Sequence, residues 1–157
     1  MHRIRKPKLS EVLELKKLVD YAYKMGFILP RTLEELYENV RDFYVYADER
    51  GLAGCVSLHI DTDRLAEIRT LVVREDAQRK GIGSLLLNAV IAEARDLEIP
   101  QVYVLTRVPE FFEKKGFRRI SIEQLPYKIR KDCARCPKFD NCDEIPMILD
   151  LPIGEKG

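Results

Sequence analysis

The stretch Glu75–Leu87, with the sequence EDAQRKGIGSLLL, decides the fold prediction. The apolar run IRTLVV at 68–73 stands before it and predicts a strand, while the leucines at its end predict a helix. Glycines between a strand and a helix expose backbone N–H groups at the positive end of the helix dipole, where no Cβ blocks a ligand. Arg79 and Lys80 add positive charge beside Gly81 and Gly83. The stretch therefore predicts an anion site that suits a phosphate or a pyrophosphate.

Two common phosphate loops do not match this stretch. A dinucleotide fingerprint requires a third glycine where Leu86 stands. A Walker loop requires lysine after its last glycine, but Lys80 precedes Gly81. A tight turn, with glycines that serve only the backbone and cations that face solvent, stays an alternative.

The whole chain has the size and composition of one compact domain over residues 1–157. It has 46% apolar residues and a net charge of +1, which suits a sizeable core. The order of strands, helix, strand, helix and strands predicts an α+β fold with a mostly antiparallel sheet and one crossover. The expected elements are a strand at 2–5, a helix from an N-cap at Ser10 to about Gly26, a helix after Thr32, a hairpin over 43–60 with its turn at 48–51, a strand at 65–73, a helix to about 96, a strand at 101–106, a short helix at 109–116 feeding a further strand, and a strand at 144–151.

The balance of positive and negative charge limits the kinds of partner that the chain is expected to bind. Charged residues are 34% of the chain but of both signs, so the one-sided basic field of a nucleic-acid or membrane-surface protein is missing. The N-terminus shows no apolar run after its basic residues, and no window approaches the roughly 18 apolar residues of a spanning helix. We expect a cytoplasmic protein with a small-molecule partner and neither nucleic acid nor membrane. A homodimer stays open.

The segment QRKGIG at 78–83 resembles the Q/R-x-x-G-x-G/A acetyl-coenzyme A motif of the GNAT N-acetyltransferases. The segment FFEKKGF at 111–117 resembles the second signature of that family, F-Y-x-x-x-G-F. The resemblance covers about residues 2–151, although the N-terminal third matches more by element order than by letters. It implies the GNAT fold: a mixed, mostly antiparallel sheet of about six to seven strands with a V-shaped splay, flanked by about four helices.

The resemblance also implies acetyl-coenzyme A as the co-substrate. In the family, backbone groups of the strand before the glycines hold the pantetheine arm and loop N–H groups hold the pyrophosphate. The cofactor-binding residues that it implies are Leu71, Val72, Val73, Gln78, Arg79, Lys80, Gly81, Ile82, Gly83 and Ser84. A backbone N–H near Val72 would polarise the thioester carbonyl.

The family places a glutamate that deprotonates the amine through water at the position of Glu67. A strand carboxylate that merely faces solvent is the alternative. Phe112 stands where many members have a tyrosine that protonates the leaving thiolate, and phenylalanine has no proton to donate. Tyr103 and Tyr127 are candidate replacements. A thiol with a pKa of about 8.5 can also leave without an acid.

The acceptor follows from a narrower resemblance. The segments AEIRTLVV at 66–73 and 28–45 resemble the acetyltransferase domain of N-acetylglutamate synthases and their short stand-alone relatives, which acetylate glutamate for arginine biosynthesis. The kinase-like domain of the long forms has no counterpart in this chain. Glutamate needs cations for two carboxylates, and arginine binds a carboxylate through two hydrogen bonds. The candidates are Arg31, Arg69 and Arg107, each of which could instead be an ordinary surface arginine.

Two other functions stay open at this point. An acetyltransferase that acts on a protein or peptide N-terminus would share the chemistry but need an open peptide groove. A non-catalytic coenzyme A-binding regulatory module would fit the absence of a tyrosine at Phe112.

Four cysteines complete the sequence. Cys55 lies in an expected strand and is best explained as a small buried residue. The others, Cys133, Cys136 and Cys142, form a C-x2-C-x5-C cluster in a loop at about 130–144, which favours a structural zinc over a disulfide. Zinc needs a fourth ligand, for which Asp132, Asp143, a distant side chain or a partner subunit are the candidates.

Overall fold

The computed structural model describes residues 3–28, 30–125 and 144–152. The chain forms two compact units, which we call the N-terminal unit (Met1–His59 and Ile68–Leu97) and the C-terminal unit (Ile60–Glu67 and Glu98–Gly157). We describe each by itself, and a single domain over 1–157 stays a prediction.

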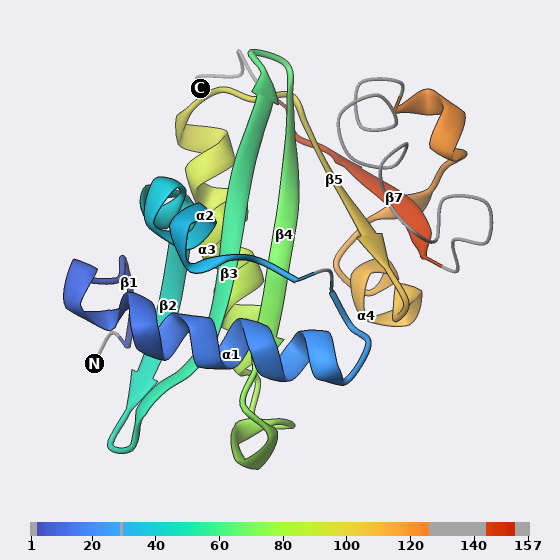
Figure 1. Ribbon diagram of the computed structural model, residues 1–157. Coiled ribbons are helices and arrows are strands. Elements are labelled where there is room, and N and C mark those ends of the chain that lie inside the picture. Colours follow the sequence, from blue (N-terminus) through green and yellow to red (C-terminus); the bar gives the residue numbers. More distant parts are fainter. Residues whose placement is uncertain (1–2, 29, 126–143, 153–157) are drawn as a thin grey trace. The chain divides into compact units, whose positions relative to one another are not determined.

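The N-terminal unit is built on antiparallel strands with helices packed against them (Figure 1). Ile4 pairs with Tyr46, and Phe43 pairs with Ser57, so the expected hairpin is confirmed. Its elements are β1 (Ile4–Arg5), α1 (Val12–Lys24), α2 (Leu33–Glu38), β2 (Phe43–Asp48), most of β3 (Gly51–Thr62), the end of β4 (Leu65–Val73) and α3 (Ile82–Asp96).

Alternate residues of β3 face opposite layers of this unit. Cys55 is fully buried in the cluster that α1 and α2 build with the strands, as expected for a small apolar residue. Gly54 points the other way, against Leu86 of α3. In Figure 1, α1 crosses in front of the strands and α3 runs behind them. The strands are therefore covered on both faces, and this explains why most of β3 is buried.

Among the helix starts that the sequence predicts, those of α1 and α2 differ in outcome. At α2 the prediction is confirmed: Thr32 Oγ1 accepts from the Glu35 N–H at 3.1 Å, and Glu35 Oε1 accepts from the Thr32 N–H at 2.8 Å. At α1 the prediction of Ser10 as the N-cap is wrong, because Ser10 lies within a 3-10 turn at Leu9–Glu11. Glu11 is the N-cap residue of α1 by position, without a side-chain cap hydrogen bond to that helix. Its carboxylate accepts from the Lys8 N–H at 2.8 Å and so caps the 3-10 turn.

The C-terminal unit contains the start of β4, β5 (Gln101–Thr106), α4 (Pro109–Glu113), β6 (Arg118–Arg119) and β7 (Ile145–Asp150). Leu65–Glu67 run parallel to Gln101–Tyr103, and β7 pairs antiparallel with both β5 and β6. Its apolar cluster is centred on Tyr103, Leu125 and Ile148.

The strands form one seven-stranded sheet in the order β1-β2-β3-β4-β5-β7-β6. The β4–β5 pair is parallel, while the β1–β2, β2–β3, β5–β7 and β6–β7 pairs are antiparallel. Together with the four α-helices found among the described residues, this confirms the expected α+β fold with a mixed, mostly antiparallel sheet. The V-shaped splay stays a prediction. Among the described residues, we find no helix with the length and apolar character that a membrane span requires.

Candidate active site

The glycine loop lies where the sequence predicted it, between β4 and α3. Gly81 is the N-cap residue of α3 and has φ +83°, a left-handed conformation that favours glycine. The first bond of the helix runs from the Leu85 N–H to the Gly81 carbonyl at 3.1 Å. The N–H groups of Ile82, Gly83 and Ser84 therefore precede the helical ladder. The first turn of α3 carries no acidic residue and no side-chain cap, so an anion is the suitable partner for these groups.

The residues before Gly81 present cations and hold the loop in place. Arg79 and Lys80 are exposed, and Arg79 itself has φ +67°. Gln78 donates from Nε2 to the Val73 carbonyl oxygen at 3.0 Å and so ties the loop to the end of β4. The side chain of Ile82 is buried in the core, so this residue offers only its backbone.

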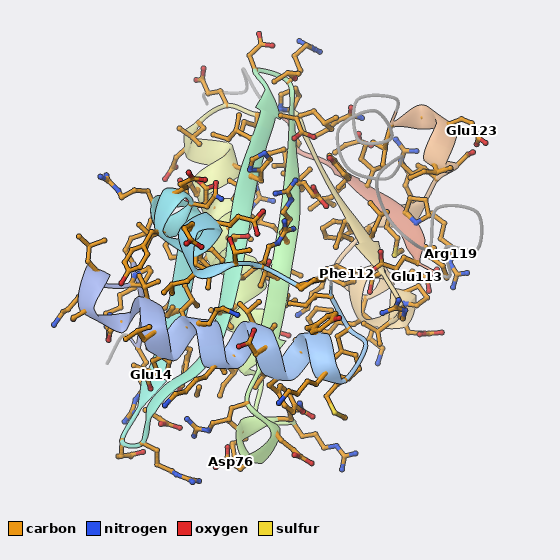
Figure 2. All side chains as sticks on the ribbon, viewed as in Figure 1. Glu14, Asp76, Phe112, Glu113, Arg119 and Glu123 are labelled. Atoms are coloured by element: carbon orange, nitrogen blue, oxygen red, sulfur yellow. The ribbon has the colours of Figure 1, made fainter. Side chains whose placement is uncertain are left out.

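A charged network anchors the turn that leads into the loop. Arg74 donates to Asp48 Oδ2 at 2.7 Å, to Asp76 Oδ1 at 2.5 Å and to the Leu52 carbonyl oxygen at 3.1 Å. Arg50 also pairs with Asp76, which projects from the turn after β4 in Figure 2. The hydrogen bonds from Arg74 lower the pKa of both aspartates from their ordinary values. No local sequence pattern indicates this network, because Arg74 and Asp48 are 26 positions apart.

The end of β4 carries a backbone feature that the sequence did not predict. Thr70 has φ +58°, which is a strained conformation for a β-branched residue. Its carbonyl oxygen accepts from Cys55 Sγ at 3.4 Å, and burial raises the pKa of that thiol to about 12. Strain of this kind is common at binding sites, and here it directly precedes Leu71–Val73. Of these three residues, Val72 is buried while Leu71 and Val73 are partly exposed.

A pocket lies beside this part of β4, within the N-terminal unit. Its empty volume is about 310 Å³, including the part open to solvent. Arg31 and Arg69, two of the predicted substrate-binding residues, both line it. His59 Nδ1 is 3.6 Å from Asp42 Oδ2. The lining residues are Arg31, Glu35, Leu36, Asn39, Asp42, Phe43, Ser57, His59, Arg69 and Thr70.

The third predicted arginine is placed differently. Arg107 follows β5, is partly buried and belongs to the C-terminal unit. The structure thus brings Arg31 and Arg69 to one pocket, and that pocket's lining does not include Arg107.

Glu67 is buried, with 4% of its surface exposed, so the alternative of a solvent-facing carboxylate is wrong. It pairs with Tyr103 across β4 and β5, and the Tyr103 hydroxyl is 3.5 Å from Glu67 Oε1. The same hydroxyl donates to Asp61 Oδ2 at 2.5 Å. A buried glutamate is uncommon in a folded protein unless it is paired or has a task in the site. No local sequence pattern indicates the role of Asp61, because it lies 42 positions from Tyr103.

Phe112 has a structural explanation. Its ring is buried and makes edge-to-face contacts with Phe111 and Phe117, with centroids 5.0 Å and 5.3 Å away. Arg119 donates to Glu113 Oε2 at 2.9 Å, and Figure 2 labels both of these residues together with Phe112. The family signature at 111–117 therefore builds an aromatic cluster in this chain.

Several predicted residues lie outside the described part of the chain: Tyr127, Asp132, Cys133, Cys136, Cys142 and Asp143. Within the described ranges, no group of three or more His, Cys, Asp or Glu residues could hold a metal ion. The zinc site stays a prediction.

Comparison with known proteins adds a family and several relatives. The family model described as acetyltransferase (GNAT) domain matches residues 39–119. An uncharacterized N-acetyltransferase of Chlorobaculum tepidum is 37% identical over 149 residues, which cover 94% of this chain and 96% of that one. An amino-acid acetyltransferase of Mycobacterium tuberculosis is 39% identical over 140 residues, covering 87% and 79%.

Two solved structures are also similar. N-acetylglutamate synthase from Neisseria gonorrhoeae, complexed with coenzyme A and N-acetyl-glutamate, matches with a TM-score of 0.86 and 26% identity. The match covers 95% of this chain but only 35% of the Neisseria chain. Rv2747 from Mycobacterium tuberculosis, in complex with CoA and NLQ, matches with a TM-score of 0.81 and 30% identity, covering 95% and 99%.

Proposed function

Since this chain belongs to the GNAT acetyltransferase family and is an acyltransferase, we propose that it transfers acetyl from acetyl-coenzyme A to the amino group of a small acidic amino acid, glutamate. The observation that carries the proposal is the pocket beside β4, which both Arg31 and Arg69 line. The non-catalytic module considered above is not retained, because the relatives are acetyltransferases.

The end of β4 and the glycine loop are the proposed site for acetyl-coenzyme A, which supplies an activated acetyl group. The N–H groups at the start of α3 and the charges of Arg79 and Lys80 suit its pyrophosphate. The backbone of Leu71–Val73 is the proposed partner of its pantetheine arm. That the two similar solved structures contain coenzyme A supports this assignment.

Glu67 is the proposed base of the reaction. An alkylammonium has no lone pair, so the acceptor must lose a proton before it attacks the thioester carbonyl carbon. Glu67 takes that proton through water, the new C–N bond forms and the C–S bond breaks. The nitrogen loses a second proton, which ends on the sulfur, so that coenzyme A leaves as the thiol. Its buried position supports this role, since a buried carboxylate is held in place and shielded from bulk solvent.

The pocket also accounts for the choice of glutamate. Glutamate carries two carboxylates and an ammonium group, and the pocket combines the cations Arg31 and Arg69 with the carboxylates of Glu35 and Asp42. Arginine binds carboxylates through two parallel hydrogen bonds, so each arginine is a proposed clamp for one carboxylate. Arg107 is a further proposed clamp. The N-acetyl-glutamate in the Neisseria structure supports glutamate as the acceptor. A role in arginine biosynthesis in the cytoplasm is part of the proposal.

A panel of free amino acids tests the proposal directly. Purified protein is supplied with acetyl-coenzyme A and each amino acid, and the released thiol and the mass of the product are measured. We expect the highest kcat/KM with glutamate. Acetylation of a peptide N-terminus together with no turnover of any free amino acid would instead establish a peptide acetyltransferase.

Arginine variants then test the pocket. Arg31→Gln and Arg69→Gln each remove one charged hydrogen-bond donor to a carboxylate, which contributes about 1.5–3 kcal/mol. We therefore expect the KM for glutamate to rise about 10-fold to 100-fold in each variant. Arg41→Gln is the matched control, because Arg41 is exposed and does not line the pocket. Equal KM values in all three variants would contradict the clamp.

A further inference from the structure

A tyrosine hydroxyl lies between two carboxylates in the C-terminal unit. Tyr103 is fully buried, and its hydroxyl donates to Asp61 Oδ2 at 2.5 Å. On its other side it lies 3.5 Å from Glu67 Oε1. Glu67 is buried, whereas Asp61 is partly exposed. The three groups therefore form a chain of oxygen atoms from a buried carboxylate to one that reaches solvent.

The sheet holds this chain in place. Glu67 and Tyr103 are direct partners of the parallel β4–β5 pair, so their side chains stand on the same face of the sheet. Asp61 comes from the end of β3, just before the turn that leads into β4. On the other side of β5, Tyr103 pairs with Ile148 of β7. Apolar side chains complete the surroundings of the ring: Leu65, Leu105, Ile120, Ile122 and Leu125.

The hydroxyl has the polarity that a relay requires. A phenol has one proton to donate, and the Tyr103 hydroxyl is within reach of two carboxylates. The contact to Asp61 at 2.5 Å is much shorter than the contact to Glu67 at 3.5 Å, which favours donation to Asp61. Its oxygen lone pairs are then available toward Glu67. When Glu67 becomes protonated it turns from an acceptor into a donor, and the Tyr103 oxygen is an acceptor at the right place.

We propose that Tyr103 and Asp61 form a proton relay that returns Glu67 to its ionised state by passing the amine proton to solvent. The proposal rests on the role of Glu67 as the base in the proposed function. In each turnover an N–H bond of the acceptor breaks and an O–H bond forms on Glu67. Glu67 then passes a proton to the Tyr103 oxygen while the Tyr103 proton moves to Asp61, which releases it to water. Protons balance, and nothing is oxidised or reduced.

Because Glu67 is buried, a relay to solvent would speed the loss of the proton that it takes up. A base with 4% exposure exchanges protons with bulk water slowly unless a path leads out. The Asp61 variant separates this role from that of an acid for the leaving thiolate. An acid of that kind would not depend on Asp61, whereas the relay needs Asp61 as its exit.

The test uses Tyr103→Phe and Asp61→Asn in the full chain, each with its thermal midpoint measured. Both changes keep the size of the side chain and remove one member of the relay. The matched control is Tyr21→Phe, which removes the hydroxyl of a partly buried tyrosine in the N-terminal unit. We expect kcat to fall at least about 10-fold in each relay variant and less than in Glu67→Gln, with KM unchanged. The deficit should shrink at alkaline pH, where the amine arrives neutral.

The double variant Tyr103→Phe with Asp61→Asn should be no slower than the slower single variant. Either change alone already interrupts proton transfer along the relay, so the second change has no further effect. A wild-type kcat in Tyr103→Phe, or a defect in Tyr103→Phe that Asp61→Asn does not share, would overturn the relay. So would a defect of equal size at every pH. The rates are measured on whichever amine the wild-type protein acetylates. Turnover of a peptide amine alone would thus remove the proposed function but still test the relay, and no turnover of any amine would overturn both.

Discussion

Gly54 lies so close to Val72 that a Cβ at Gly54 would be 3.0 Å from the Val72 carbonyl oxygen. The same Cβ would be 2.9 Å from Leu86 Cδ1 of α3. The glycine is therefore what allows α3 to approach β3 and the end of β4. Because β4 is the proposed partner of the pantetheine arm, this close approach also positions the cofactor site.

Gly54→Ala is the first prediction. The Leu86 side chain can move, but the Val72 carbonyl belongs to the backbone, so the strand has to shift. We expect a loss of about 1–3 kcal/mol in the free energy of unfolding, the usual cost of overpacking a core. Denaturant unfolding measures this loss. An unchanged midpoint would show that β4 can move at no cost.

Gly81→Val tests the anion site. The new side chain would project from the glycine loop into open space, since a Cβ at Gly81 has no heavy atom within 4 Å. It would stand beside the proposed pyrophosphate position and block the approach of the ligand, so we expect acetyl-coenzyme A binding to be lost. Calorimetry measures the affinity.

Gly26→Val is the matched control for that variant. Gly26 has φ +80°, close to the +83° of Gly81, and its Cβ would also meet nothing within 4 Å. Both variants therefore carry the same backbone strain, but Gly26 follows Met25, the C-cap of α1, and is not part of the glycine loop. Equal affinity losses in both variants would assign the effect to strain, and unchanged affinity in Gly81→Val would place the pyrophosphate elsewhere.

Glu67→Gln tests the base. We expect kcat/KM to fall by roughly 10² to 10⁴ fold at neutral pH, the usual contribution of a positioned base. The loss should become smaller at high pH, where the acceptor amine is already neutral. A pH–rate profile of both proteins measures this. A defect that does not change with pH would give Glu67 a purely structural role.

The Arg5–Glu11 ion pair predicts how stability depends on pH. Arg5 Nη1 and Nη2 bind Glu11 Oε1 and Oε2 at 2.8 Å and 2.7 Å. The hydrogen bond from Arg5 lowers the pKa of Glu11 from 4.5 to about 2. A carboxyl group with a lowered pKa stabilises the fold above pH 4.5, and this contribution is lost as the pH falls toward 2. We expect a contribution of about 1 kcal/mol, because solvent screens a pair in which Arg5 is 38% exposed.

Unfolding experiments on the wild-type protein and on Glu11→Gln measure this contribution. The difference in stability between the two proteins should be constant above about pH 5 and shrink below pH 4.5. A difference that persists at pH 2 would show that packing, and not the charge of Glu11, is responsible.

The cysteine cluster predicts a bound metal. Thiolates of Cys133, Cys136 and Cys142 would hold a structural zinc, so protein prepared without chelator should contain about one zinc per chain. Metal analysis is paired with a count of free thiols under denaturing conditions. No metal with fewer than four free thiols would replace the zinc with a disulfide, and no metal with four free thiols would contradict both.

Features that depend on near neighbours in the chain could be predicted from the sequence. The capping box of Thr32 and Glu35 spans three positions, and the glycine loop at 78–84 combines a left-handed glycine and a helix start within seven residues. Local rules of this kind decide the type of each element. The family resemblance then related these elements to a cofactor and a base.

Ser10 shows how the tertiary structure can override a local rule. Serine is a favoured N-cap residue, and the residues next to Ser10 do not oppose that role. The carboxylate of Glu11 is instead held by Arg5 of β1 and by the Lys8 N–H. A 3-10 turn at Leu9–Glu11 therefore precedes α1, and the N-cap of α1 is Glu11, one residue after Ser10.

The sequence by itself determined the order of the elements, the glycine loop and the chemistry expected of Glu67. The reason is that periodicity, turn residues and family motifs each depend on residues that are close together in the chain. Only the tertiary structure decided that Arg31 and Arg69 line one pocket, and that the Tyr103 hydroxyl stands between Glu67 and Asp61. Contacts across 38 or 42 positions depend on how strands pair and in which register, and a long-range pairing leaves no periodic signal in the residues that it joins.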